Sequence, residues 1–230
     1  MLTIYPYENL GHANHGWLDA RHHFSFASYH NPKRHNFGVL RVINDDKVAA
    51  GTGFDTHPHR DMEIITYVRS GAITHRDSEG NVGRTGAGDV QVMSAGSGVE
   101  HSEHNLENVD TTLYQIWIYP NANGVQPRWD AREFPKTPVQ NALNLVVSGD
   151  KNDDALFIHQ DAKIYAGRLN AGTEITHKIK HQAYILVSEG QVEIDGQLLK
   201  KGDGAEIVAQ TEIHIKAIKN CEILVIDVPN

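Results

Sequence analysis

Residues 51–63 read Gly51-Thr-Gly-Phe-Asp-Thr-His57-Pro-His59-Arg-Asp-Met-Glu63, and a second short motif, His101-Ser-Glu103, follows later in the chain. Side chains two residues apart in a β-strand point to the same face. His57 and His59 are therefore expected to present two imidazoles on one strand face. His101 and Glu103 are expected to present an imidazole and a carboxylate on another. If these two faces meet, they form a site with three nitrogen ligands and one oxygen ligand.

A single His-x-His pair can arise by chance on a protein surface, but two ligand-bearing pairs with the same spacing favour a metal site. Three imidazoles and one carboxylate suit Fe(II), Mn, Co, Ni or Cu. A structural zinc site would more usually use thiolates, and the chain has one cysteine, Cys221. Four protein ligands leave two positions of an octahedral ion open for substrate oxygens, or for a substrate and dioxygen together.

Two glutamates near these motifs are given separate roles. Glu103 is predicted to be a ligand that can also act as a general base, accepting a hydroxyl proton from an arriving substrate. Pure ligation is the alternative for Glu103. Glu63 shares the face of His57 and His59 if the strand stays regular. We interpret it as a hydrogen-bond acceptor for a histidine N–H or as a buried structural carboxylate.

Histidines are concentrated in the first half of the chain, since 11 of the 15 lie within residues 1–104. His75 and His104 are weaker ligand candidates, and strand alternation predicts that His104 points outward. Four earlier histidines are expected in loops or on the surface: His12, His15, His22 and His23. Farther along, Trp117 is expected in the core, with Gln115 as a polar group facing the cavity.

The composition is that of an ordinary globular protein, with 40% hydrophobic and 22% charged residues among 230. The formal charge is −8 and the cations are scattered, which argues against direct nucleic-acid binding. No apolar run is long enough to span a membrane, and the N-terminus lacks the pattern of a secretory signal. These features, with a single cysteine, favour a cytoplasmic location.

The chain is expected to be all-β, because short runs rich in Val, Ile, Thr, Tyr and Trp alternate with Gly, Asn and Asp turns. The expected strands in the first half are 38–43, 63–68, 72–76, 90–93 and 112–119. Those in the second half are 143–147, 163–168, 183–188, 192–194, 206–207, 214–217 and 222–227.

The two halves resemble each other. A strand, a glycine turn and a Gly-Asp turn occur in the same order around Gly71 and Gly88 and again around Gly190 and Gly202. We therefore expect two copies of one β-barrel unit: a metal-binding domain over residues 1–132 and a metal-free domain over residues 133–230. The proline-rich segment 120–138 is expected to connect them. The second copy offers only His177 and His181, separated by lysines, and these are interpreted as structural or surface residues.

At these residues the chain resembles the cupins, and more narrowly the pirin family. Gly51, His57, His59 and Glu63 match the first cupin motif, and Ser94-Ala-Gly96 before His101-Ser-Glu103 resembles the pirin form of the second. The resemblance covers nearly the whole chain and implies a bicupin fold of two tandem antiparallel β-barrel (jelly-roll) domains. It also implies His57, His59, His101 and Glu103 as the metal ligands, with Glu63 not a ligand.

The segments 11–19, 23–27 and 41–45 resemble bacterial pirin-like proteins with quercetin 2,3-dioxygenase activity. That resemblance implies cleavage of a flavonol by dioxygen with release of carbon monoxide, at one divalent metal. Fe(II) is the expected ion, with Mn, Ni, Co, Cu and Zn left open. The alternative is a metal-binding, redox-sensitive regulator that binds a protein partner, as a transcriptional co-regulator or enzyme inhibitor, without turnover. We expect a monomer.

Overall fold

The computed structural model describes all residues from Met1 to Asn230 and is almost entirely β-structure, with one short 3-10 helix at Tyr7–Asn9. It divides into two compact units. The N-terminal unit comprises Gly11–Phe134 and Leu156–Gln160, and the C-terminal unit comprises Met1–Leu10, Pro135–Ala155 and Asp161–Asn230. No helix is long and apolar enough to cross a membrane.

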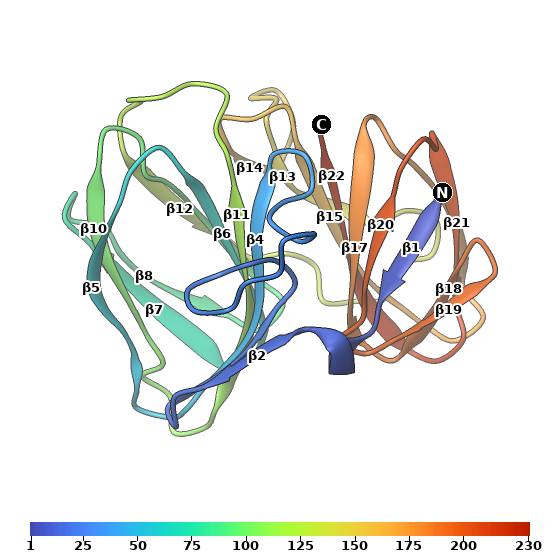
Figure 1. The fold of residues 1–230 in the computed structure, drawn as a ribbon, viewed down its shortest axis with the longest axis horizontal. Helices are drawn as coiled ribbons and strands as arrows, with labels where there is room; N and C mark the ends of the chain where they lie inside the picture. Colours follow the sequence, from blue (N-terminus) through green and yellow to red (C-terminus); the bar gives the residue numbers. More distant parts are fainter. The chain divides into compact units, whose positions relative to one another are not determined.

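The N-terminal unit contains two antiparallel sheets (Figure 1). The larger has the strand order β12 (Arg128–Arg132), β9 (Val90–Ser94), β6 (Glu63–Ser70), β11 (Thr111–Ile118), β4 (Leu40–Val48), β3 (Leu18–His22) and β2 (Gly11–Asn14). The smaller has the order β5 (Gly53–His59), β10 (Val99–His104), β7 (Ala72–Asp77) and β8 (Val82–Gly86). A short strand, β14 (Leu156–Phe157), also belongs to this unit.

The C-terminal unit repeats this plan. Its larger sheet has the order β1 (Leu2–Tyr5), β20 (Gly204–Ile207), β17 (Gln182–Glu189), β22 (Cys221–Val228), β15 (Lys163–Leu169) and β13 (Asn144–Ser148). Its smaller sheet has the order β16 (Glu174–Lys178), β21 (Glu212–Ala217), β18 (Gln191–Ile194) and β19 (Gln197–Lys200).

The expected internal repeat is confirmed by these strand orders. The series β9-β6-β11-β4 corresponds to β20-β17-β22-β15, and β5-β10-β7-β8 corresponds to β16-β21-β18-β19. The hairpin glycines Gly71 and Gly190 both have positive φ, 72° and 77°, which glycine adopts without a steric penalty. The all-β class and the two cupin domains are therefore confirmed. The sheets remain separate in jelly-roll fashion, however, rather than closing into continuous barrels.

The apolar cores explain why the strands form where they do. All eight residues of β22 are buried, as expected of a strand hydrogen-bonded on both sides. A single large apolar cluster fills the C-terminal unit and includes Ile185, Val187, Ile215 and Val225. The N-terminal unit contains apolar clusters around Leu113 and around Met93.

Two details of the chain path differ from the sequence-based expectation. The first ten residues belong to the C-terminal unit, because β1 pairs with β20 through contacts such as Leu2 opposite Ile207. The segment 120–138 is not wholly a connection. Its Arg128–Arg132 part forms β12 and pairs with β9, extending the larger sheet of the N-terminal unit. Prolines on either side of β12 concealed this short strand in the sequence.

Candidate metal centre

The histidine motifs lie on adjacent strands. In the pairing of β5 with β10, His57 is opposite His101 and His59 is opposite Val99. Pro58 lies between the two histidines and is tolerated because β5 is an edge strand of its sheet. The pairing shifts between His101 and Glu103, so that Glu103 is opposite Phe54. Two residues of β5, Asp55 and Thr56, thus lie opposite one residue of β10, Ser102. This bulge turns Phe54 and His57 toward the same side.

Three imidazoles converge as a result. One ring nitrogen from each of His57, His59 and His101 lies within 4.8 Å of the others. The ring centroids are 4.8 Å apart for His57 and His59, and 4.5 Å apart for His57 and His101. The Nε2 atoms of His59 and His101 are buried and have no hydrogen-bond partner. Buried polar atoms normally have a hydrogen-bond partner, so these two unpaired nitrogens fit the role of metal ligands.

Hydrogen bonds at the other ring nitrogens set the tautomers. Nδ1 of His57 donates to the carbonyl oxygen of Asp55 at 2.6 Å, which leaves the Nε2 lone pair available. Burial lowers the pKa of His59 to about 4 and that of His101 to about 3, with the neighbouring imidazoles adding to the effect. Both rings are therefore neutral at pH 7, which is the form that binds a metal.

His75 supports His101 from behind. Its Nε2 is 2.9 Å from the carboxylate of Asp77, and its Nδ1 is 3.4 Å from Nδ1 of His101. Because a carboxylate only accepts, Nε2 of His75 carries the proton and Nδ1 accepts from His101. His101 is then left with a bare Nε2. Trp129 stacks on His75 with centroids 5.1 Å apart and an interplanar angle of 9°, which holds the ring in place.

Glu103 lies in the same cavity but outside the group of three imidazoles. Its carboxylate accepts hydrogen bonds from Gln91 Nε2 at 2.5 Å, from Thr66 Oγ1 at 3.1 Å and from Gln115 Nε2. The side chain of Glu103 is almost fully buried, at 2% exposed. Three donors thus hold this carboxylate in place without a cationic side chain.

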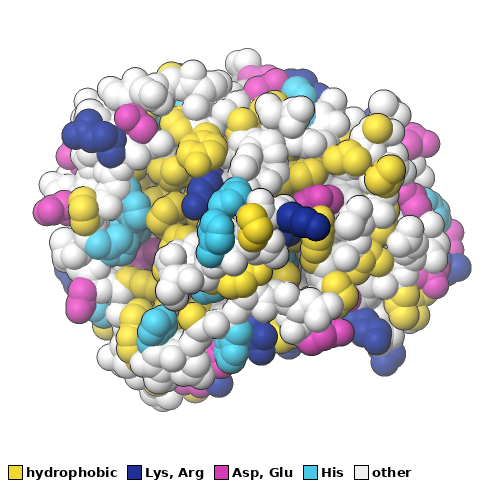
Figure 2. Space-filling model, in the orientation of Figure 1, with side chains coloured by type: hydrophobic (Ala, Val, Ile, Leu, Met, Phe, Trp, Pro, Cys, Tyr) yellow, Lys and Arg dark blue, Asp and Glu magenta, His cyan; other side chains and the backbone are white.

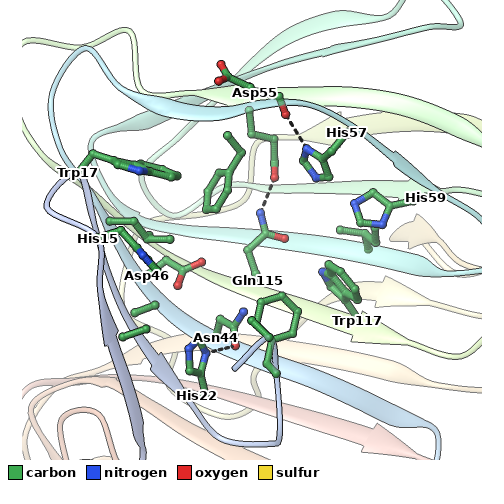
Figure 3. Close-up of a pocket in the computed structure, with 18 of the residues that line it drawn as sticks. His15, Trp17, His22, Asn44, Asp46, Asp55, His57, His59, Gln115 and Trp117 are labelled. Carbon is green, nitrogen blue, oxygen red and sulfur yellow. Dashed lines mark hydrogen bonds between the residues drawn. The ribbon is translucent and has the colours of Figure 1, made fainter. Parts of the chain in front are cut away.

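The imidazoles and Glu103 line one pocket of about 480 Å³, within the range of small-molecule sites. Figure 3 shows His57 and His59 on one side, with the Gln115 amide near the centre. Much of the remaining wall is aromatic or aliphatic: Trp17, Leu18, Phe26, Phe54, Ile64 and Trp117. Histidine side chains also gather on the surface over this unit (Figure 2). The arrangement combines a cluster of nitrogen donors with space for a flat apolar ligand.

The structure decides between the two interpretations of Glu63. β5 ends at His59, and Glu63 begins β6 in the other sheet after a turn in which Asp61 has φ +48°. Glu63 therefore does not continue the face of the histidine pair. Its carboxylate accepts from Ser94 Oγ at 2.8 Å and from the backbone of His159, and it is buried, so the structural interpretation is the one that fits.

Two of the four early histidines were misjudged. His22 and His23 are buried, at 4% and 1% exposed. His12 and His15 are exposed, as expected, although His15 lines the pocket together with His22. The N-terminal β2–β3 hairpin extends the larger sheet and covers part of the cavity, a long-range relationship that no local spacing indicates.

Three further expectations can be compared with the structure. Trp117 was expected in the core but lines the pocket, 4.9 Å from the His59 ring between centroids. The cavity-facing position of Gln115 is confirmed. His104 is turned away, about one third exposed and 3.5 Å from the Asp55 carboxylate, as alternation predicted.

In the C-terminal unit, His177 and His181 make separate contacts. His177 on β16 is buried against Tyr165, with centroids 4.6 Å apart, and burial lowers its pKa. His181 is hydrogen-bonded to Asp161 at 3.0 Å. These contacts agree with structural roles for both side chains. The absence of a metal from this unit stays a prediction.

Comparison with known proteins agrees with this architecture. The family described as Pirin matches residues 5–118, and the one described as the quercetinase C-terminal cupin domain matches residues 145–228. The chain is 45% identical over 232 residues to the quercetin 2,3-dioxygenase of Escherichia coli K12, covering 100% of this chain and 99% of the relative. The chain belongs to the pirin family.

Two other relatives of this pirin are informative. A pirin-like protein of Caulobacter vibrioides is 48% identical, with 99% of both chains covered. The crystal structure of the bacterial pirin YhhW from Escherichia coli in complex with nickel(II) superposes with a TM-score of 0.93. It is 43% identical and is covered to 99%, with 100% of this chain covered. A solved member of the family thus binds a divalent metal.

Proposed function

We propose that this pirin is a metal-dependent dioxygenase of the quercetinase type, with a flavonol and dioxygen as substrates. His57, His59 and His101 would be the nitrogen ligands of one divalent metal, and Glu103 the oxygen ligand. The observation that carries the proposal is the convergence of three imidazoles, two with unpaired buried Nε2 atoms, in an aromatic pocket.

The donor set fits such an ion. Imidazole and carboxylate are ligands of Fe, Mn, Co, Ni and Cu, and the neutral imidazoles bind without first releasing a proton. We propose Fe(II) as the working metal, because a redox-active ion favours oxygen chemistry. The nickel in YhhW is compatible with this, since a site of this kind accepts several first-row metals.

Glu103 is the group of this chain best suited to move a proton. A flavonol offers adjacent hydroxyl and carbonyl oxygens, and a bound metal would polarise such a pair and open a path to dioxygen. Glu103 would accept the hydroxyl proton as the flavonol binds. Gln91, Thr66 and Gln115 hold the carboxylate through hydrogen bonds, so its position does not depend on the substrate.

The aromatic wall of the pocket would bind the flavonol rings. Phe54 and Trp17 meet edge to face with ring centroids 5.1 Å apart, and Phe26 and Trp117 meet in the same way at 5.4 Å. These rings can pack on a flat ligand and exclude water from the reacting carbons. In the reaction one O2 is consumed and one CO released, so that the product gains one oxygen and loses one carbon.

Elemental analysis of protein purified without added metal, followed by an aerobic assay of the iron-loaded protein with quercetin, tests the proposal. We expect one equivalent of metal, loss of the flavonol absorbance and release of carbon monoxide. If the fully loaded protein shows no loss of flavonol absorbance and releases no carbon monoxide, the proposal is contradicted. A partner recovered in a metal-dependent way from such inactive protein would favour the regulatory alternative.

A further inference from the structure

A second polar group faces the pocket from the sheet opposite the histidines. Asp46 lies on β4 of the larger sheet, whereas His57 and His59 lie on β5 of the smaller one. Its side chain lines the pocket yet is only 2% exposed, and its Oδ1 has no hydrogen-bond partner. Figure 3 shows the carboxyl group directed into the cavity, on the side away from His57 and His59.

The neighbouring carboxyl group, unlike that of Asp46, is held in an ion pair. Asp45 points to the other face of β4 and forms a buried ion pair with Arg69. Burial, with additional repulsion from Asp45 and Glu103, raises the pKa of Asp46 well above its usual value. Burial thus favours the protonated form of Asp46, which can both donate and accept a hydrogen bond.

A polar strip continues from Asp46 along the same wall. Asn44 is two residues earlier on β4 and faces the same way, and its Oδ1 is 2.8 Å from Nδ1 of His22. Asn44 is thus already engaged, whereas Asp46 is not. A buried polar group without a hydrogen-bond partner is unfavourable, so its presence in a ligand pocket indicates a partner supplied by the ligand.

We propose that Asp46 is a specificity-determining residue that hydrogen-bonds a phenolic hydroxyl of the ligand, at the end remote from its metal-chelating oxygens. The ligand class is then a flat polyhydroxylated aromatic with a chelating oxygen pair at one end and a hydroxyl at the other. The inference rests on the proposed function only in assigning the chelating end to the three histidines. The apolar wall between the two ends packs on the rings but cannot tell a hydroxyl from a hydrogen.

The test compares ligands and variants by binding, so that it is independent of turnover. Quenching of the intrinsic tryptophan fluorescence reports on the pocket, because Trp17 and Trp117 line it. The ligands are quercetin, the flavonol lacking its phenyl-ring hydroxyls, and the flavonol lacking its benzo-ring hydroxyls. Each is titrated anaerobically into the nickel-loaded wild type, Asp46→Leu, Asp46→Asn and the control Asp19→Asn, which alters an exposed carboxylate on β3.

We expect the wild type and Asp19→Asn to bind one of the two dehydroxylated flavonols about tenfold more weakly than quercetin. Asp46→Leu should bind quercetin and that dehydroxylated flavonol about equally. The nearly isosteric Asp46→Asn should keep part of the discrimination, because an amide also donates and accepts hydrogen bonds. Equal discrimination in the wild type and Asp46→Leu overturns the inference, as does a wild type that binds no flavonol or does not discriminate. If Asp46→Leu does not fold, unchanged discrimination in both Asp46→Asn and Asp46→Ser overturns it equally.

The experiments distinguish failure of this inference from failure of the proposed function. Discrimination that depends on Asp46, in protein that releases no carbon monoxide from quercetin, would retain the binding assignment and remove the dioxygenase. Turnover of quercetin by the wild type with no effect of Asp46→Leu on any ligand would do the reverse.

Discussion

Nδ1 of His75 lies 3.4 Å from Nδ1 of His101, with Asp77 2.9 Å from the opposite ring nitrogen of His75. Asp77, His75 and His101 thus form a chain of hydrogen bonds, which ends at the unpaired Nε2 of His101. Groups that orient a ligand histidine commonly influence metal affinity 10- to 100-fold. His75 is consequently a positioning residue, although it belongs to neither sequence motif.

Replacement of His75 tests this chain. We expect His75→Leu to weaken nickel affinity about tenfold to a hundredfold while the far-ultraviolet circular dichroism stays that of the wild type. Competition with a chromophoric chelator measures the affinity. His12→Leu is the control, since His12 is exposed and paired with Asp19. Wild-type affinity in His75→Leu would mean that the 3.4 Å contact has no role in ligand orientation.

Gln115 provides a test of the carboxylate. Its amide donates to Glu103, and hydrogen bonds to charged groups contribute about 1.5–3 kcal/mol. We expect Gln115→Leu to lower kcat for quercetin about tenfold to a hundredfold, with KM changed less, because Glu103 loses a group that fixes its position. Steady-state kinetics measures both constants. The exposed Gln197 offers a control, and an unchanged kcat in Gln115→Leu would argue against Glu103 as the base.

Glu63 should make stability depend on pH. Burial raises its pKa to about 7 from an ordinary value of 4.5, so the folded state favours the protonated acid. The stability it contributes is complete below about pH 4.5 and is lost as the pH rises toward 7, by up to about 3 kcal/mol. Glu63→Gln should therefore gain stability relative to the wild type at pH 8 but not at pH 4.5.

Urea denaturation of both proteins at the two pH values measures this difference. Glu100→Gln, at an exposed position in the same unit, should show no such pH-dependent gain. A difference between Glu63→Gln and the wild type that is the same at pH 4.5 and pH 8 would contradict the assignment.

Cys221 should be unreactive in the native protein. It is 4% exposed on the central strand β22, and burial raises the pKa of its thiol to about 11. Since the thiolate is the reactive form, we expect almost no labelling by a chromogenic disulfide reagent at pH 8 and one equivalent after denaturation. Prompt labelling of the folded protein would show that the first residues of β22 open locally.

The sequence predicted the parts of this protein that depend on local spacing. The alternation of His57 with His59 and the matching glycines of the repeat both appear in the strands as expected. It did not predict relationships that depend on register. The shift between His101 and Glu103, the turn that moves Glu63 to another sheet and the pairing of β1 with β20 all involve strands distant in the sequence.

The pocket was predictable only in part, for the same reason. Gln115 was expected to face the cavity because it is a polar residue in an otherwise apolar strand. His22 and Asp46 reach it because β2, β3 and β4 lie side by side on the larger sheet, and no motif marks that arrangement. The polar wall that carries Asp46 therefore became visible only in the three-dimensional structure.

The central claim is that His57, His59 and His101 hold one metal ion together. A crystal of the nickel- or iron-loaded protein, with diffraction recorded on both sides of the metal absorption edge, tests it most directly. We predict one strong anomalous peak within bonding distance of all three imidazoles, and its loss in His101→Ala crystals of unchanged fold. A peak elsewhere in the chain, or one that persists in His101→Ala, would contradict the account.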